Sequence, residues 1–520
     1  MEKNRNFLKS IGLCALSGVM TSISFSFENL WFLCFFSLMP MFFAFRFYIR
    51  KLNCRQSAVS FFVYGFSLYS TLMLWLLELS PVLEEEMPKS AAYALIMLAI
   101  VLSALFLGIY YSLALIFARV FSKGPLVDCA VFDFLYILGE FFTGLFNPLS
   151  FPWARLCVIA TPFTAFIQSA SLFGGLFVSL IIVLFNCIFC LALCSCRSPK
   201  KCIAYVSAAL LLIGANTLYG VIRLENAEKP TDECNAVIVQ GNFSGLSKWR
   251  SSREEIISTY ISLAEEKIDE NTEFVVFPET AVPFRLYQDE ASLLMLTDFA
   301  SRNNIVLVTG VFYEEEGDVY NSLVCIEPDG KISEPYHKQV LVPLGEYVPF
   351  ADFLMKRWPE LFEIIGYVKA GDGHGAVSTS RGIIGGVICY ESIYPNIVRQ
   401  SVVKGAQVIT LISNDSWFGE SPALYQHHAH ARLRAVENNR YVLRASSTAI
   451  SSAIDNHGRI IVTAPELKSA AVKASYQMIP EKTLYTTVGD IVLIPSLIIV
   501  FYALYLIVKR RKSCEKSDSE

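Results

Sequence analysis

Three side chains with reactive groups lie at the ends of apolar runs in the second half of the chain. Glu279 closes the run VVFPE, Cys389 closes GGVIC, and Lys338 stands in the segment YHKQVLVPLGEYVPF. A thiol there can act as a nucleophile if a base or cation lowers its pKa, and a lysine ammonium can hold an oxyanion. Apolar neighbours raise the pKa of a carboxylate, so we expect Glu279 to have a raised pKa suited to a base.

Taken singly, each of these residues has an ordinary structural explanation. Glu279 alone is most often a solvated loop carboxylate, Lys338 a surface lysine and Cys389 a core thiol. What favours a site is their joint occurrence in the order Glu, Lys, Cys, each within a distinctive local motif. The three residues therefore define the candidate site.

Strand-like and helix-like runs alternate around these residues. The apolar strand-like runs are 235–242, 273–280, 304–313, 321–330, 383–392, 406–415 and 441–455. The helix-like runs between them are 252–269, 291–304, 394–405 and 423–439. Strands that alternate with helices predict a layered α/β sandwich, in which chemistry is expected at the strand ends.

The composition of the whole chain is that of a membrane protein. Of 520 residues, 54% are hydrophobic and 17% are charged, against about 25% charged in ordinary soluble domains. This argues against a soluble cytoplasmic enzyme and against disorder, and a formal charge of -4 gives no reason to expect a nucleic-acid partner. Runs long enough to span a bilayer lie near 7–27, 29–48, 57–79, 91–118, 126–146, 165–194, 203–222 and 488–508.

These runs divide the chain into four parts. We expect a membrane domain of seven helices at 1–222, a globular α/β domain at 223–487, a last span at 488–508 and a basic tail at 509–520. Lys and Arg gather in alternate loops and in the tail, which places both termini in the cytoplasm and the globular domain outside it. The first run has no clear cleavage site, so we interpret it as a retained signal anchor.

Cysteine usage points to a free thiol in the globular domain. That domain holds Cys234, Cys325 and Cys389. Three is an odd number in an oxidising compartment, so at least one of them is expected to be unpaired or reactive.

The motifs of the globular domain resemble a known family. They read QGNFSGLSKW (240–249), FPETAVPF (277–284), YHKQVLVPLGEYVPF (336–350), GGVICYES (385–392), NDSWFGE (414–420) and QHHAHARLRAVENNRYVLRASSTAIS (426–451). Together they resemble the nitrilase superfamily, whose members use a Glu, Lys, Cys triad against a carbonyl carbon. The chain is more closely similar to the apolipoprotein N-acyltransferase family, whose layout of seven spans, a catalytic domain and one further span matches the hydropathy pattern.

The resemblance implies a fold, a reaction and a location. The fold would be an α-helical membrane domain of eight spans with an inserted nitrilase-like α-β-β-α sandwich. The reaction would move a fatty acyl chain from a phospholipid to the α-amino group of the N-terminal diacylglyceryl-cysteine of an apolipoprotein, through a thioester on Cys389. It would need no cofactor and no metal. The protein would work in a bacterial inner membrane, as a monomer, with its catalytic domain in the periplasm.

The resemblance also implies a role for individual residues. Glu279 would take the proton of the Cys389 thiol, and Lys338, with a backbone N–H near Tyr390, would stabilise the oxyanion. Glu346 would hold Lys338 or assist proton transfer. The remaining family positions, Trp249, Tyr390 and Glu391, would shape the pocket, with Trp249 binding substrate.

Other features leave alternatives open. Segments 282–294 and 350–368 would form a lipid-facing mouth or, with equal weight, ordinary core filling. His427, His428 and His430 suggest a metal site, but their spacing lacks an HExxH pattern, so we expect none. The acids Asp128, Asp133 and Glu140 in or beside the fifth span would suit a transporter, although pairing between helices or a place near the membrane interface is the preferred explanation. A membrane-tethered amidase of nitrilase type is the main rival.

Overall fold

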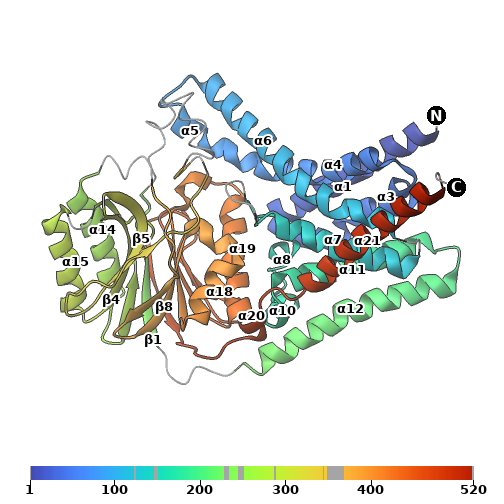
Figure 1. Ribbon diagram of the computed structural model, residues 1–520. Coiled ribbons are helices and arrows are strands. Elements are labelled where there is room, and N and C mark those ends of the chain that lie inside the picture. Colours follow the sequence, from blue (N-terminus) through green and yellow to red (C-terminus); the bar gives the residue numbers. More distant parts are fainter. Residues whose placement is uncertain are drawn as a thin grey trace. The chain divides into compact units, whose positions relative to one another are not determined.

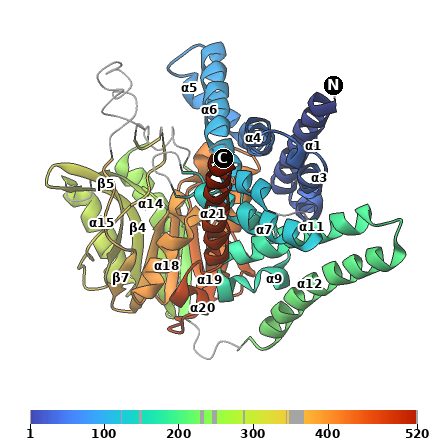
Figure 2. The same ribbon diagram turned by 45° about the vertical axis from the view of Figure 1, so that its right-hand side comes forward.

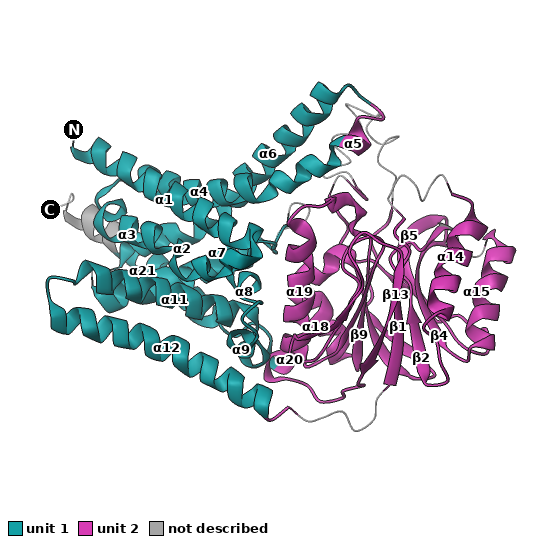
Figure 3. Ribbon diagram, turned by 180° about the vertical axis from the view of Figure 1, so that it is seen from behind, with its two compact units in different colours: residues 1–80, 87–225, 488–520 teal, residues 81–86, 226–487 magenta. Residues whose placement is uncertain are grey.

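The chain forms two compact units, which we describe separately. The computed structural model describes residues 2–121, 124–145, 150–227, 234–243, 251–285, 288–343, 345–347 and 368–517, with the backbone alone at 284 and 510–517. Unit 1 comprises Met1–Ser80, Met87–Glu225 and Val488–Glu520, and unit 2 comprises Pro81–Glu86 and Asn226–Thr487 (Figure 3).

Unit 1 is entirely helical among its described residues (Figures 1 and 2). Its main helices are α1 (Glu2–Ser26), α3 (Met39–Phe47), α4 (Cys54–Leu72), α6 (Lys89–Leu115), α7 (Pro125–Phe142), α11 (Gly175–Cys194), α12 (Pro199–Glu225) and α21 (Leu493–Ser517). The described residues contain six helical segments long and apolar enough to cross a membrane. These are Glu2–Ser26, Glu28–Lys51, Cys54–Leu83, Lys89–Val120, Gly175–Cys194 and Pro199–Glu225.

Two further spans expected from hydropathy are less clear-cut. Helix α7 has 18 residues, but it carries the three acids noted in the sequence. The apolar part of α21, Leu493–Lys509, belongs with shorter helices of 10–17 residues. A helical region with several apolar helices is therefore confirmed, whereas the count of eight spans stays a prediction.

The acids of α7 are buried within unit 1. Asp128 pairs with Arg46 of α3 at 2.8 Å and with Arg50 at 2.7 Å. Glu140 accepts a hydrogen bond from the backbone N–H of Leu156 at 2.9 Å. Because partners of this kind offset the cost of a buried charge, pairing between helices explains Asp128, as predicted.

Unit 2 contains two β-sheets. The first has seven strands in the order β13-β1-β2-β4-β5-β6 with β3 beside β4, and the second has six in the order β12-β11-β10-β9-β8-β7. The first sheet is built from β1 (Cys234–Gln240), β2 (Thr272–Val276), β3 (Val282–Arg285), β4 (Val306–Glu315), β5 (Asp318–Ile326), β6 (Tyr336–His337) and β13 (Ala470–Tyr476). The second is built from β7 (Ala376–Thr379), β8 (Gly382–Ile388), β9 (Val408–Ser413), β10 (Val442–Ser446), β11 (Ser452–Ile454) and β12 (Ile460–Thr463).

The two sheets pack face to face, and helices cover their outer faces (Figure 1). Along β1, Ala236 and Ile238 belong to the core between the sheets, while Val237 and Val239 belong to the core beneath the outer helices. This alternation follows from the two-residue period of a strand. Helices α14 (Arg253–Glu265) and α15 (Glu290–Arg302) cover the first sheet, and α18 (Pro395–Val403) and α19 (Ala423–Asn438) cover the second. The predicted α-β-β-α sandwich is confirmed.

Parallel pairing in the middle of each sheet brings strand ends together. Strand β2 runs parallel to β1 and β4, and β9 runs parallel to β8 and β10. Two short 3₁₀ helices begin at or near strand ends: η6 (Cys389–Ile393) follows β8 directly, and η7 (Asp415–Phe418) begins two residues after the end of β9. The sandwich thus presents Cys389 at the carboxyl end of a central strand, where the sequence led us to expect chemistry.

Candidate active site

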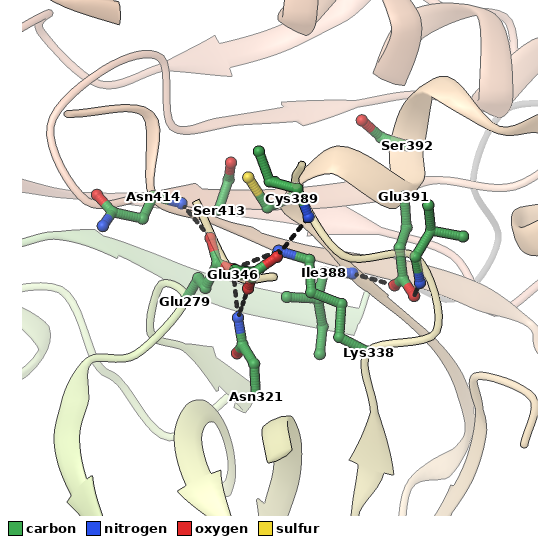
Figure 4. Close-up of polar contacts among 12 residues, drawn as sticks. Glu279, Asn321, Lys338, Glu346, Ile388, Cys389, Glu391, Ser392, Ser413 and Asn414 are labelled. Carbon is green, nitrogen blue, oxygen red and sulfur yellow. Dashed lines mark hydrogen bonds and ion pairs between the residues drawn. The ribbon is translucent and has the colours of Figure 1, made fainter. Parts of the chain in front are cut away.

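Glu279, Lys338 and Cys389, which lie far apart in the sequence, come together in unit 2 (Figure 4). Lys338 follows β6, and its Nζ lies 2.9 Å from Oε1 of Glu279. The Cys389 thiol lies close enough to the same carboxylate for each group to shift the pKa of the other. Glu279 and Lys338 are both buried, so water does little to weaken their attraction.

A second carboxylate, that of Glu346, also forms an ion pair with Lys338. Nζ of Lys338 lies 2.9 Å from Oε2 of Glu346, which matches the predicted position of Glu346 beside Lys338. Asn321 of β5 lies between the two acids, and its Nδ2 donates to Glu279 at 2.7 Å and to Glu346 at 2.8 Å. One ammonium and one amide thereby hold two carboxylates close together despite their repulsion.

These contacts shift the pKa of Glu279 downward, the opposite of the expected direction. Burial alone would raise this pKa, but Lys338 and the hydrogen bonds outweigh burial and lower it below its ordinary value. The backbone N–H of Asn414 adds a further hydrogen bond, at 2.7 Å. The prediction of a raised pKa was wrong because apolar neighbours in the sequence gave no sign of the lysine.

The two carboxylates, Glu279 and Glu346, keep Lys338 charged. Burial would lower the pKa of Lys338, yet Glu279 and Glu346 raise it well above its usual value. The resting site therefore holds an ionised carboxylate and an ammonium at neutral pH. A carboxylate in that form can accept a proton, whereas the lysine can only donate hydrogen bonds and positive charge.

Cys389 sits in a strained turn. It begins η6 and has a φ of 52°, in the left-handed region that costs a non-glycine residue about 1–2 kcal/mol. Strain of this kind at a strand-to-helix turn is a known way of presenting a nucleophile. Burial, followed by the charge of Glu279, raises the pKa of the Cys389 thiol, with Lys338 opposing the rise. The resting sulfur is thus a thiol, and it must pass its proton to a base as it reacts.

Glu391 joins the lysine segment to the turn of the nucleophile. The fully buried carboxylate accepts hydrogen bonds from the Tyr336 hydroxyl at 2.9 Å, the Gln339 N–H at 2.6 Å and the Ile388 N–H at 2.9 Å. Tyr336 and Gln339 flank Lys338, and Ile388 precedes Cys389 in the chain. Burial raises the pKa of Glu391 to about 7. Glu391 thus links the segment that carries Lys338 to the strand end that carries Cys389 through hydrogen bonds.

Of the other predicted site residues, Tyr390 lies within the described part of the chain and Trp249 lies outside it. Tyr390 is buried, and its ring meets the ring of Tyr394 edge-on at 5.4 Å between centroids. Trp249 lies outside the described residues, as does most of the segment 350–368. In the other proposed mouth segment, 282–285 form β3 and 290–302 form α15, two elements of the sandwich.

Two site residues escaped the sequence interpretation. Asn321 and Asn414 stand in the runs NSLVCIEPDG and NDSWFGE, but the side-chain amide of Asn321 and the backbone N–H of Asn414 meet Glu279 only once the strands are assembled. Gly310 of β4 is a further requirement, since a Cβ added there would lie 2.7 Å from Cα of Glu279. A glycine at this place is a signal that two backbones approach closely.

The described residues offer no metal site. They contain no group of three or more His, Cys, Asp or Glu side chains arranged to hold a metal ion. His427 hydrogen bonds to Asp415 at 2.9 Å, whereas His428 lies 2.8 Å from Ser452. The neighbouring histidines thus face different partners. Among the described residues, none of Cys234, Cys325 and Cys389 forms a disulfide.

Comparison with protein families matches both parts of the chain. Residues 236–478 match the model of a carbon-nitrogen hydrolase, and residues 17–188 match that of an apolipoprotein N-acyltransferase N-terminal domain. Three similar proteins all bear the name apolipoprotein N-acyltransferase. The Agrobacterium fabrum protein is 31% identical over 76% of this chain and 75% of its own length. That of Haemophilus ducreyi is 28% identical over 80% and 82%, and that of Shewanella oneidensis 26% identical over 98% of each chain.

Among solved structures, the chain is similar to Saccharomyces cerevisiae Nit3, a member of branch 10 of the nitrilase superfamily. The likeness has a TM-score of 0.38 at 20% identity and covers 51% of this chain and 97% of Nit3.

Proposed function

Because the chain belongs to the apolipoprotein N-acyltransferase family, we propose that it transfers a fatty acyl chain from a phospholipid to the α-amino group of the N-terminal diacylglyceryl-cysteine of apolipoproteins, with Cys389 as the carrier. The observation that carries this proposal is the ionised Glu279 and Lys338 pair held against the thiol of Cys389. Phospholipid is the acyl donor and an apolipoprotein the acceptor.

The first stage acylates the enzyme. Glu279 takes the proton of the Cys389 thiol as sulfur attacks an ester carbonyl of the phospholipid. The carbonyl oxygen becomes an oxyanion, and the ammonium of Lys338, with a backbone N–H near Tyr390, is proposed to stabilise it. When the tetrahedral intermediate collapses, the lysophospholipid oxygen leaves with the proton from Glu279. The acyl group remains on sulfur as a thioester.

The second stage transfers the acyl group to nitrogen. The neutral α-amino group of the acceptor attacks the thioester carbonyl, and Glu279 takes a proton from that nitrogen. Collapse expels the Cys389 sulfur, which recovers the proton, and leaves an amide on the lipoprotein. Glu346, which lies 2.9 Å from Lys338, keeps the ammonium in place while Glu279 is briefly neutral.

The protein is a multi-pass membrane protein with several apolar helices. We further propose eight spans, with α7 and α21 added to the six long segments, and both termini in the cytoplasm. The basic loops support this orientation, which puts unit 2 in the periplasm at a bacterial inner membrane. Trp249 is proposed to bind substrate, and the chain is proposed to act as a monomer.

The rival hypothesis of a membrane-tethered amidase is not favoured. An amidase would share the Glu279, Lys338 and Cys389 arrangement, but it would have no need of the helical region. Here residues 17–188 match the N-terminal domain of the acyltransferase family itself. A lipid donor and a lipidated acceptor both reside in a bilayer, which gives the membrane helices a purpose.

The test is transfer by the purified full-length protein in detergent. The protein is given a phospholipid of one defined acyl chain and a diacylated lipopeptide, and the peptide is analysed by mass spectrometry. We expect N-acylation by wild type and by Cys234→Ala, a control that removes another cysteine of unit 2, but none by Cys389→Ala. Amide hydrolysis without N-acylation, or turnover by Cys389→Ala, would contradict the proposal.

A further inference from the structure

A second buried polar network touches the turn that carries Cys389. Its centre is His427 of α19, which is 1% exposed. Nε2 of His427 lies 3.1 Å from the carbonyl oxygen of Cys389 and 2.8 Å from Oγ of Ser392. Both partners belong to η6, so one imidazole contacts the first and the fourth residue of the turn. Ser392 points away from Glu279 and Lys338 in Figure 4.

The ring of His427 is itself held in place. Nδ1 lies 2.9 Å from Oδ1 of Asp415 and 3.3 Å from a guanidinium nitrogen of Arg444. Because the carboxylate can only accept, Nδ1 donates to it; Nε2 then accepts from the Ser392 hydroxyl when the ring is neutral, and it donates to the Cys389 carbonyl when the ring carries a second proton. Phe418 meets the ring at 84°, with 5.8 Å between centroids. Asp415 is buried and also accepts from Ser413 at 2.6 Å and from the buried guanidinium of Arg444.

The charge on Asp415 is secure. Burial would raise the pKa of Asp415, but Arg444 and His427 outweigh burial and hold it well below its usual range. An ionised Asp415 fixes the orientation of the ring, as second partners of active-site histidines commonly do.

The same segment also reaches the proposed base. Asn414, the residue before Asp415, donates its backbone N–H to Glu279 at 2.7 Å. The segment after β9 is therefore bonded to Glu279 directly and to the turn of Cys389 through His427. Because the left-handed φ of Cys389 is unfavourable by itself, contacts from outside the turn must hold it.

We propose that His427 is a positioning residue for the acyl transfer, which fixes the turn at Cys389 through its carbonyl oxygen and Ser392, while Asp415 fixes the ring of His427. The proposal rests on the proposed function, because the direction of the thiol matters only if Cys389 is the nucleophile. Ser392 points away from Glu279 and Lys338 (Figure 4), and His427 bonds to Ser392, so the proposal gives neither residue a contact with substrate. The array of Asp415, His427 and Ser392 thus supports the thiol and is no second catalytic triad.

His428 provides a matched control. It is the next residue of the same helix, is also buried, and bonds to Ser452 of β11, outside η6. His427→Leu and His428→Leu each remove one buried imidazole, but only the first removes the contact with the turn. The rate of thioester formation on Cys389 is measured with a defined phospholipid over a range of lipid concentrations, beside thermal unfolding of each variant.

We expect His427→Leu to slow acylation about 100-fold, as misplacement of a reacting group by about 1 Å can do, with the half-saturating lipid concentration little changed. His427→Gln, which keeps an N–H donor, should recover part of the rate. His428→Leu should acylate at close to the wild-type rate. The proposal is overturned if His427→Leu acylates like wild type, or if both leucine variants are slowed equally.

A second pair of variants and a lipid-free assay keep the test decisive if His427→Leu does not fold or wild type forms no acyl adduct. If His427→Leu gives no unfolding transition, the comparison is made between His427→Gln and His428→Gln, and equal rates for these two would overturn the proposal. Alkylation of Cys389 by iodoacetamide, which needs no lipid, is measured in parallel. Slower alkylation in the His427 variant alone supports the positioning role even if wild type forms no acyl adduct, an outcome that would instead refute the proposed function.

Discussion

Replacing Glu279 with glutamine removes the base and its charge, and it turns one of the two oxygens that accept hydrogen bonds from Asn321, Lys338 and Asn414 into an NH2 donor. The amide has nearly the same shape, and Lys338 keeps Glu346 at 2.9 Å. An amide cannot take the thiol proton, and general base catalysis contributes about 10²–10⁴-fold. We therefore expect acylation of Cys389 to fall about 1000-fold at pH 7, which corresponds to about 4 kcal/mol in the activation barrier.

The dependence on pH distinguishes loss of the base from loss of fold. The lowered pKa of Glu279 and the raised pKa of Lys338 keep both groups charged at neutral pH, so the wild-type rate should be flat between about pH 6 and 9. In Glu279→Gln the reaction must use thiolate already present. Since the pKa of the thiol is raised, its thiolate fraction grows about tenfold per pH unit, and the rate should rise about 100-fold from pH 7 to 9.

The assay is rapid quenching followed by intact-protein mass spectrometry of the acylated fraction. Glu265→Gln serves as the control, because Glu265 is an exposed partner of Arg302 at the surface of unit 2. This control should follow the wild-type profile. The reasoning is refuted if Glu279→Gln acylates within about tenfold of wild type at pH 7, or if its rate is as flat with pH as that of wild type.

Other perturbations test the neighbouring contacts. Lys338→Met leaves the buried Glu279 without its cation, so the free energy of unfolding should fall by about 3–5 kcal/mol. The fall should be larger at pH 8 than at pH 5, because burial without the lysine raises the pKa of Glu279. Chemical denaturation measures the change, and a fall no greater than in the exposed control Lys369→Met would contradict the prediction. Glu391 has its pKa raised from 4.5 to about 7, so its contribution is present at low pH and lost as pH rises through that range. The stability difference between wild type and Glu391→Gln should therefore shift by about 3 kcal/mol between pH 4 and 8, in favour of the variant at high pH, and a constant difference would disprove it. Gly310→Ala places a methyl group 2.7 Å from Cα of Glu279, so the acylation rate should fall, and an unchanged rate would mean that the backbones can separate freely.

Periodicity was enough to predict the framework of unit 2. The helix expected at 423–439 is α19 (Ala423–Asn438), and the strand expected at 235–242 is β1 (Cys234–Gln240). Strand β13 (Ala470–Tyr476) was not foreseen, because its sequence AAVKASY is rich in small residues and lacks an apolar run. Its pairing with β1 is a long-range contact that local patterns do not contain.

The site was predictable in its reactive residues and not in their surroundings. Glu279, Lys338 and Cys389 stood out because each follows an apolar run or a turn-rich motif. Asn321 lies 42 residues from Glu279 and Asn414 lies 135 residues from it, so neither hydrogen bond leaves a trace in local sequence. The wrong sign for the pKa of Glu279 has the same origin, since the lysine that lowers it is 59 residues away.

Hydropathy predicted eight spans, and six of the eight runs coincide with long apolar helical segments of the described residues. The other two stay predictions: α7 carries three acids, and the described apolar part of α21 is Leu493–Lys509. His427 was expected to lie in a helix that binds no metal, and the local sequence gave no sign of its contacts with Asp415 and the turn of Cys389. Its contacts became visible only when α19 was packed against η6.

The most direct test of the account is a single turnover divided into its two stages. Wild-type protein is incubated with a phospholipid of defined acyl chain and then separated from excess lipid. Its mass is measured by mass spectrometry, and a diacylated lipopeptide is then added. The account predicts one acyl group on Cys389, removable by hydroxylamine as a thioester is, which disappears from the enzyme as an equal amount of N-acylated peptide forms. An acylated peptide without any acyl-enzyme, or an acyl group on a residue other than Cys389, would contradict it.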